Sequence, residues 1–214
     1  KTTVADASGF SPKSISSASD LAMLGLAAMD NLVITSIVAQ QSVDLPVAGT
    51  VNNVNWLLGS DGVIGIKTGN TVEAGGCFLF AAKRQVQSQD ITLVGALTEA
   101  PNLNTAIKDA RAIIRASDSG FETIKVASKG QTVGAYKSPW GRNAEAIAGQ
   151  DLSIAAWRSS QVKVNAQLNE IKAPAAAGAN VGTASVSADQ KMVSIPVILK
   201  SDLPTPAWHW RVLH

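Results

Sequence analysis

The chain has 214 residues, of which 46% are hydrophobic and 16% charged, and its formal net charge is +2. This length suits one large domain or two modest ones, and the composition excludes a disordered chain. The small charge, with no long basic run, argues against nucleic-acid binding. The single cysteine, Cys77, excludes an internal disulfide and a zinc site built from cysteines.

Both histidines, His209 and His214, lie in the last six residues of the chain. A Ser/His/Asp triad, a Cys/His nucleophile pair or a histidine-rich metal site needs a histidine in the body of the fold, so these chemistries are excluded. We therefore expect neither a metal nor another cofactor. Any acyl-transfer reaction must use a base other than histidine, and lysine is the usual substitute. No apolar run approaches the roughly 18 residues of a membrane span.

The first half of the chain has the patterns of a sheet flanked by helices. Ser17 and Asp20 form a capping-box pattern at the start of a predicted helix. The apolar positions at helical spacing behind this cap are Leu21, Leu24, Ala28 and Leu32. Three short apolar runs between turn residues then predict adjacent antiparallel strands covered on both faces, at residues 63–67, 76–83 and 90–98. A second helix is predicted for residues 102–117, and the residues on its apolar face are Ile107, Ala110, Ile113 and Ile114.

The second half has short strand-like runs with turn signals between them and no helical period. Seven such runs predict a small all-β domain, either a sandwich or an open barrel. They span residues 122–127, 131–137, 144–149, 152–157, 161–168, 180–188 and 191–200. The expected fold is therefore an α/β domain followed by a small all-β, sandwich-like domain. We place the boundary near residue 120, which gives domains 1–119 and 120–214.

Lys67-Thr68-Gly69 ends the apolar run that begins at Val63, so it is predicted to lie late on a strand. A lysine ammonium, a hydroxyl and backbone N–H groups at this place could bind an acyl substrate that ends in a carboxylate. Glycine would let the substrate backbone approach closely. Spacing alone also allows a solvated lysine followed by a glycine turn.

Lys-Thr-Gly is the third of three motifs in enzymes that attack acyl groups with a serine, so a nucleophilic serine must be sought. The one Ser-x-x-Lys joins Ser160 to Lys163, and no Ser-x-Asn occurs in the chain. The residues that follow alternate as in a strand, where positions three apart point to opposite faces. We therefore interpret Ser160 and Lys163 as ordinary solvated positions.

Four stretches together resemble the low-molecular-mass penicillin-binding proteins, the serine-type D-alanyl-D-alanine carboxypeptidases. They read "DASGFSPKSISSASDLAMLGLAA", "NVNWLLGSDGVIGIKTGNTVEAGG", "GFETIKVASKGQTVG" and "LNEIKAPAAAGANVGTASV". The second is the most specific, because an asparagine, paired leucines, Ile-Lys-Thr-Gly and a Thr-x-x-Ala-Gly turn occur in order. The resemblance implies a transpeptidase-like domain followed by a β-rich domain. It also implies an extracytoplasmic bacterial protein at the cell wall or the outer face of the cytoplasmic membrane, with a part in peptidoglycan biosynthesis and cell shape.

The resemblance implies roles for five residues of this chain. Lys67 would provide positive potential beside the nucleophile, and Thr68 would hydrogen-bond the terminal D-alanine carboxylate. Gly69 would leave room for the substrate, and Thr71 would lie at the substrate-binding end of the strand. The backbone N–H of Asn70 would be one of two oxyanion donors. The family often has an arginine after the last sheet strand, and this chain has none there.

The nucleophile motifs that the family carries upstream are missing, so we expect the C-terminal part of a longer enzyme. The expected partners are stem peptides ending in D-Ala-D-Ala, β-lactam antibiotics, and either the missing part of the peptidase domain or a second copy. Trp208, Trp210 and Leu213 form an aromatic end that could pack on the domain or lie near a membrane. Two other classes stay open: a non-catalytic module that binds peptidoglycan or a protein, and a serine β-lactamase. The trailing β-rich domain argues against the β-lactamase.

Overall fold

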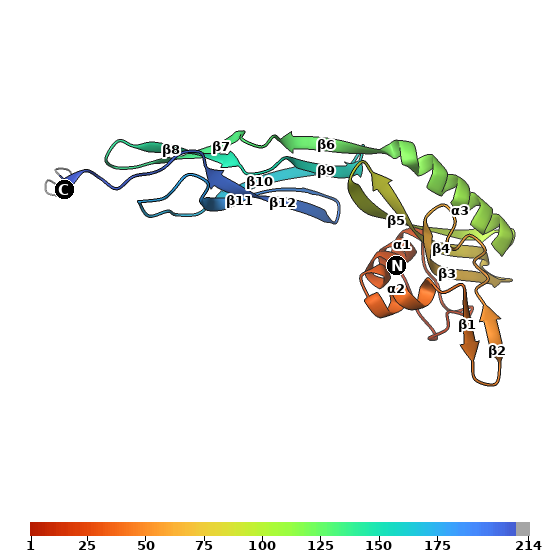
Figure 1. Cartoon of the computed structure of the whole chain (residues 1–214). Coiled ribbons are helices and arrows are strands. Elements are labelled where there is room, and N and C mark those ends of the chain that lie inside the picture. Colours follow the sequence, from red (N-terminus) through yellow and green to blue (C-terminus); the bar gives the residue numbers. More distant parts are fainter. Residues whose placement is uncertain (209–214) are drawn as a thin grey trace. The chain divides into compact units, whose positions relative to one another are not determined.

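The computed structural model describes residues 1–208, which fold as two compact units (Figure 1). Unit 1 is Lys1–Gly120, and unit 2 begins at Phe121. The residues of the two buried apolar clusters come from different units, so each unit has its own core. Unit 1 is mixed α/β and unit 2 is all-β, which confirms the predicted fold class. Trp210 and Leu213, predicted to extend an aromatic end, lie outside the described residues, as do both histidines.

Two short helices open unit 1: α1 (Ala18–Met29) and α2 (Leu32–Val38). The Ser17 side chain accepts a hydrogen bond from the N–H of Asp20 at 3.1 Å, which confirms the predicted cap. The prediction that one helix continues to Leu32 was wrong. The Asn31 side chain accepts hydrogen bonds from the N–H groups of Val33 and Ile34, so it caps a new helix there.

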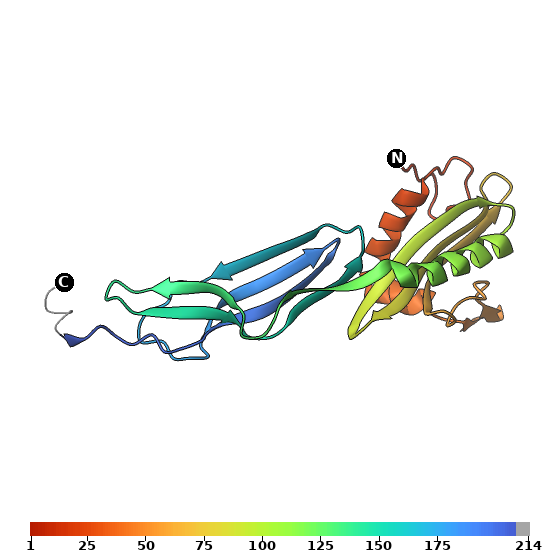
Figure 2. The same cartoon turned by 90° about the horizontal axis from the view of Figure 1, so that it is seen from above.

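A three-stranded antiparallel sheet forms the centre of unit 1, with strand order β3-β4-β5. Its strands are β3 (Val63–Thr71), β4 (Gly75–Val86) and β5 (Gln89–Ala100), as predicted. The chain then forms α3 (Leu103–Ser117) and a 3₁₀ turn, η1 (Asp118–Gly120), that ends the unit. Figure 2 shows α3 lying along this sheet.

The sheet is covered on both faces because successive residues of a strand point to opposite sides. Phe78 and Phe80 of β4 are buried in one cluster with residues of α3. The intervening Leu79 points to the other face, where its side chain lies against Gly25 of α1. The predicted apolar face of α3 is largely correct, since Ile107, Ala110 and Ile114 are buried. Ile113, however, is 50% exposed.

A hairpin that was not predicted lies between α2 and β3. Its strands, β1 (Ser42–Leu45) and β2 (Gly49–Asn52), form a separate two-stranded sheet, and all their residues are exposed. The usual alternation of buried and exposed side chains is therefore absent, so burial does not dictate the pattern of this segment.

Unit 2 consists of two antiparallel sheets that enclose one core. The five-stranded sheet has the order β10-β11-β12-β8-β7, and β6 pairs with β9 in the second sheet. All seven predicted strands are present: β6 (Phe121–Ala127), β7 (Thr132–Lys137), β8 (Asn143–Ala148), β9 (Leu152–Trp157), β10 (Val162–Leu168), β11 (Asn180–Ala188) and β12 (Lys191–Leu199). Ile154 of β9 is buried in one cluster with Val186 and Val197 of the larger sheet. Unit 2 is thus sandwich-like.

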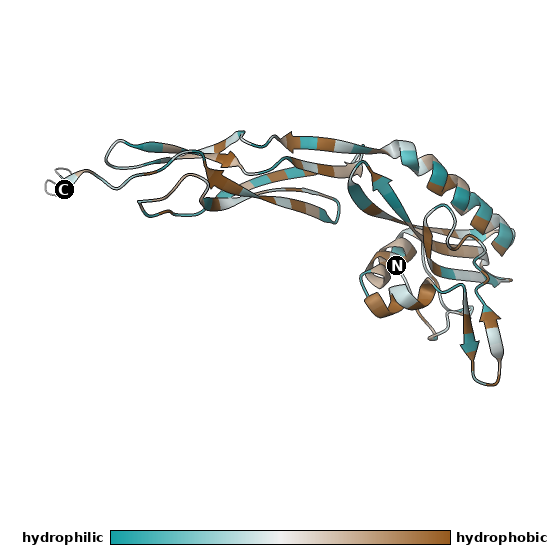
Figure 3. Ribbon diagram, viewed as in Figure 1, coloured by the Kyte–Doolittle hydropathy of each residue, from teal (hydrophilic) through white to brown (hydrophobic). Residues whose placement is uncertain are grey.

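Hydrophobic residues, coloured brown, gather on α2 and on parts of α1 (Figure 3). On these two helices Met23, Leu24, Leu32, Val33 and Ile37 are each more than half exposed. Among the described residues no single helix is long and apolar enough to cross a bilayer. The two helices together reach that length and apolarity, but the chain bends by 107° between them. Grouped apolar exposure of this kind is typical of a surface that another protein surface covers.

We predict that the chain alone self-associates through the exposed surface of α1 and α2. Leu32→Asp, at a side chain that is 84% exposed, should raise the monomer fraction in light scattering without changing the helical circular dichroism. The matched control is Met192→Asp in unit 2, at a side chain that is 69% exposed, which should leave the monomer fraction unchanged. A wild-type chain that is monodisperse and monomeric at all concentrations would contradict this prediction.

Candidate active site

The Lys-Thr-Gly sequence lies on β3, at the edge of its sheet. β3 pairs with β4 on one side, and no other described strand pairs with it. In this register Lys67 is opposite Leu79, and Gly69 is opposite Cys77. In an antiparallel pair, alternate residues direct their backbone N–H and C=O groups away from the partner strand. Every second residue of β3 therefore presents backbone groups to a ligand that approaches this free edge.

Lys67 and Gly69 lie on the sheet face that α1 covers, because Leu79, opposite Lys67, points to that face. Lys67 is exposed, and its ammonium donates a hydrogen bond to the carbonyl of Thr68. Thr71 falls on the same face by alternation, whereas Thr68 and Asn70 fall on the other. The structure thus brings three of the five predicted site residues to one face.

The side chains of Asn70 and Thr71 both have hydrogen-bond partners within unit 1. The Asn70 side-chain oxygen accepts a hydrogen bond from the N–H of Leu103, the first residue of α3, at 3.2 Å. The Thr71 hydroxyl accepts one from the N–H of Ala74 at 3.0 Å, within the turn to β4. The side chain of Asn70 therefore joins the end of β3 to α3, and the predicted oxyanion role concerns its backbone N–H alone.

Gly69 differs from the other glycines of this sheet. A Cβ atom at Gly69 would meet only the Cβ of Cys77, at 3.7 Å, which is ordinary contact. At Gly76 a Cβ would approach the carbonyl carbon of Asn102 to 2.2 Å, so packing within the chain requires glycine there. Among the described residues, nothing that packs near position 69 requires glycine there. The free space above Gly69 is thus open to a ligand.

Cys77 lies on the same face as Gly69 and is half-buried. Its Sγ donates to the carbonyl oxygen of Ala74 at 3.4 Å. The thiol therefore contributes to the turn that ends β3.

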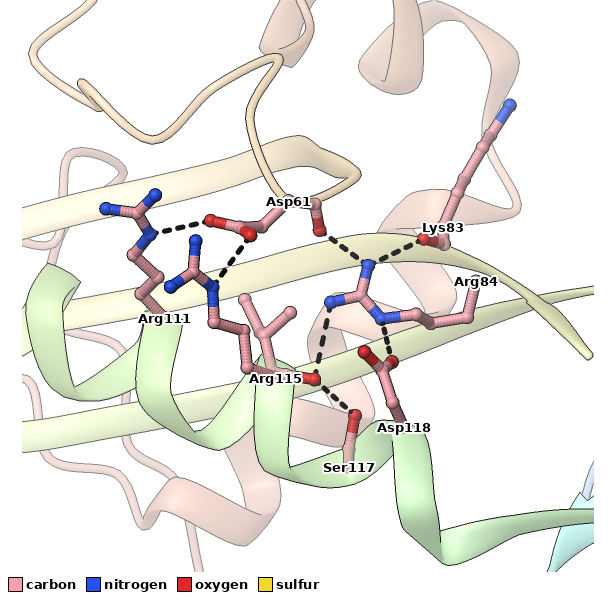
Figure 4. Close-up of polar contacts among 8 residues, drawn as sticks. Asp61, Lys83, Arg84, Arg111, Arg115, Ser117 and Asp118 are labelled. Carbon is pink, nitrogen blue, oxygen red and sulfur yellow. Dashed lines mark hydrogen bonds and ion pairs between the residues drawn. The ribbon is translucent and has the colours of Figure 1, made fainter.

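An ion-pair network fixes the start of β3 (Figure 4). Asp61, two residues before the strand, pairs with Arg111 at 2.7 Å and with Arg115 at 2.9 Å, both on α3. The hydrogen bonds from Arg115 and Arg111 lower the pKa of the Asp61 carboxyl. Asp61 has a φ of 48°, a left-handed conformation that aspartate tolerates better than most residues.

Arg84 of β4 belongs to the same network (Figure 4). Its guanidinium donates to the carbonyl of Asp61 at 2.5 Å and pairs with the carboxylate of Asp118 at 2.7 Å. It also donates to the carbonyl of Ile114 at 3.3 Å. The Arg84 side chain is only 13% exposed, so these bonds satisfy a charge that is largely withdrawn from water. Sequence reasoning missed this network because its partners lie 23 to 54 residues apart.

Ser160 and Lys163 of the one Ser-x-x-Lys lie in unit 2, away from β3 in the sequence. Ser160 lies in the turn before β10, so the argument from strand alternation does not apply to it. Its hydroxyl donates to the carboxylate of Asp189 at 2.5 Å. Among the described residues no group of His, Cys, Asp and Glu side chains is placed to hold a metal ion.

Two protein families match successive parts of the chain. The D-alanyl-D-alanine carboxypeptidase family matches residues 1–96, which include all of β3. The C-terminal domain family of penicillin-binding protein 5 matches residues 121–205, which include every strand of unit 2. No curated protein sequence matches the chain.

Solved structures with the same fold include penicillin-binding protein 5 from Haemophilus influenzae. It is 22% identical, with a TM-score of 0.51, and the match covers 91% of this chain and 58% of that one. A second is the peptidoglycan synthesis regulatory factor PBP3 from Streptococcus pneumoniae. It is 19% identical, with a TM-score of 0.57, and the match covers 91% of this chain and 59% of that one. This chain therefore spans less than two thirds of either protein.

The fold and the two family matches define the class as penicillin-binding proteins of the carboxypeptidase type. Within that class, residues 1–96 belong to the D-alanyl-D-alanine carboxypeptidase family, and residues 121–205 belong to the family of the penicillin-binding protein 5 C-terminal domain.

We predict that Asp61→Asn lowers the thermal midpoint of unit 1 by about 2–4 °C at pH 7, because asparagine keeps the turn but removes the charge. Circular dichroism of the helices reports on unit 1, which contains α1, α2 and α3. The Asp61 pKa is depressed below 3.8, so its contribution is complete well above pH 3.8. It is lost as the pH falls through the lowered pKa, and the wild-type and variant midpoints should then converge. Asp109→Asn, on the exposed side of α3, is the control, and equal midpoints for Asp61→Asn and wild type at pH 7 would contradict the prediction.

Two glycine substitutions distinguish a glycine that packing requires from a glycine that leaves space for a ligand. Gly76→Ala should destabilise unit 1 by about 1–3 kcal/mol, because the new methyl group collides with the backbone of Asn102. Gly69→Ala should stay within about 0.5 kcal/mol of wild type, because its methyl group makes only ordinary contact. Urea unfolding measures both. An equal loss in the two variants would show that Gly69 is also held by packing.

Proposed function

We propose that the intact protein is a serine-type D-alanyl-D-alanine carboxypeptidase and that unit 1 is the part of its peptidase domain that supplies the Lys-Thr-Gly strand. The observation that carries this proposal is the free edge of β3. There an exposed Lys67 shares one face with Gly69, above which the chain leaves space. The match of residues 1–96 to the carboxypeptidase family supports the same conclusion.

The free edge of β3 suits a substrate peptide that binds as an added strand. Lys67 would place positive potential beside the reacting carbonyl, where negative charge develops in the transition state. Thr68 would hydrogen-bond the terminal carboxylate of D-alanine, and the backbone N–H of Asn70 would donate to the oxyanion. Thr71, bonded within the turn, would bound the site at the end of the strand.

A serine from outside these 214 residues would supply the nucleophile. It would attack the D-Ala-D-Ala amide, release the terminal D-alanine and form an acyl-enzyme that water then hydrolyses. The one Ser-x-x-Lys of this chain does not fill that role, because the Ser160 hydroxyl is bonded to Asp189 in unit 2. The exposed surface of α1 and α2 is where the rest of the peptidase domain would pack.

The remaining assignments follow from the same proposal. β-Lactam antibiotics would acylate the same serine, because they mimic the D-Ala-D-Ala end of the stem peptide. The protein would act outside the cytoplasm, on the cell wall at the outer face of the bacterial membrane. Unit 2 would hold the peptidase domain at the wall and carry contacts of its own, and the aromatic end at Trp208 would lie towards the membrane.

The test is denaturing intact-mass spectrometry of the purified protein after exposure to benzylpenicillin. We expect a penicilloyl adduct on a companion polypeptide and none on this chain. Lys67→Ala should slow adduct formation on the order of a hundredfold, as expected for the loss of one transition-state contact. The matched control is Lys83→Ala, an exposed lysine of β4, which should acylate at the wild-type rate. The absence of an adduct on every polypeptide present would favour a binding module over an enzyme.

A further inference from the structure

Unit 2 contains a pocket of about 660 Å³ that the acyl chemistry of unit 1 does not use. It lies where β9 ends and β10 begins, beside the turn that joins β11 to β12. Its volume is within the range of roughly 300–1,000 Å³ that is typical of small-ligand sites. Its lining combines one aromatic side chain, Trp157, with hydroxyl, amide and charged groups.

Trp157 is held in place while part of its surface stays open. Its ring meets Phe121 edge to face, with centroids 5.0 Å apart and an interplanar angle of 85°. The residue is nevertheless 39% exposed. An indole fixed in this way presents a flat, electron-rich surface that attracts C–H groups carrying partial positive charge.

The polar side of the pocket is tied together by one short hydrogen bond. The Ser160 hydroxyl donates to the Asp189 carboxylate at 2.5 Å, which links the β9–β10 turn to the β11–β12 turn. Asp189 has a φ of 52°, a left-handed conformation that aspartate tolerates better than most residues. Gln161 beside Ser160 is exposed and adds an amide donor and acceptor to the lining.

The charges of the pocket are balanced. Lys163 on β10 lies opposite Ser187 on β11, and its ammonium is matched by the carboxylate of Asp189. A lone anion would meet Asp189, and a purely apolar ligand would strip water from these polar groups without replacing their hydrogen bonds. The ligand that fits has a C–H face for the indole and neutral hydroxyl or amide groups for the rest.

We propose that this pocket of unit 2 binds a saccharide, with one sugar ring on Trp157 and its hydroxyl or acetamido groups on Gln161, Lys163 and Asp189. The site is independent of the proposed peptidase activity, since no residue of unit 1 lines it. If that activity is also correct, the two units contact different parts of one polymer: unit 1 the stem peptide, and unit 2 the glycan strand.

The test is isothermal titration calorimetry of the whole chain with the trimer of N-acetylglucosamine, with cellotriose, and with peptide-free glycan strands from a bacterial cell wall. We expect saturable binding of at least one saccharide. If the glycan strands bind more tightly than the trimers, the saccharide that the pocket recognises comes from the cell wall. If all three bind equally, the pocket recognises short sugars. Gln161→Ala should weaken binding about tenfold, the effect of one lost hydrogen-bonding group.

Three further variants make the result specific. Gln167→Ala, at an exposed glutamine of β10 outside the lining, is the matched control and should bind as wild type. Trp157→Ala should abolish binding, and Trp157→Phe, which keeps a ring against Phe121, should retain part of it if the loss reflects lost stacking and not unfolding. Equal affinity in wild type and Gln161→Ala, or no saturable binding of any of the three saccharides, overturns the proposal. Benzylpenicillin acylation is measured separately, so failure of one proposal leaves the other intact.

Discussion

The arrangement of unit 1 depends on the burial of β4 from both sides. Phe78 and Phe80 are buried towards α3, while Ala81 is buried from the opposite face. Because β4 also pairs with a strand along each edge, it satisfies its backbone groups and brings the remaining elements of the sheet together. β3 is left with one paired edge and one free edge. The position of Lys67 is thus a consequence of the core, although its side chain makes no contribution to that core.

Much of this fold could be predicted because buried apolar residues recur along the sequence with the period of a strand or a helix. The three strands of the first sheet and the seven of unit 2 are apolar or alternating runs, and the structure contains all of them. The hairpin of β1 and β2 has no such pattern, because all residues of both strands are exposed. The end of α1 was missed for a different reason. The apolar spacing continues to Leu32, but the side chain of Asn31 offers a cap that starts a second helix.

The sequence predicted which residues form the candidate site, but it did not predict the contacts that their side chains make. The sequence placed Lys67, Thr68 and Gly69 on a strand, and they lie on β3. It carried no information on the Asn70 side chain, which bonds the N–H of Leu103 far along the chain. The arginines that hold Asp61 were likewise indistinguishable from solvated helix residues, since ion pairs between distant segments have no sequence period. Ser160 shows the opposite case: it matches a motif in the sequence, but its hydroxyl bonds Asp189 in another turn of unit 2.

α3 is bonded near its start to β3, through Leu103 and Asn70, and near its end to the turn before β3, through Arg115 and Asp61. The same helix leads through η1 directly into unit 2. In mechanical terms it acts as a strut of about 22 Å that is held at both ends alongside the Lys-Thr-Gly strand. A force applied at the C-terminal end of α3 would reach β3 along this strut and load both attachments together. The Lys-Thr-Gly edge would then shift as a rigid whole with α3, and the spacing of its residues would be preserved.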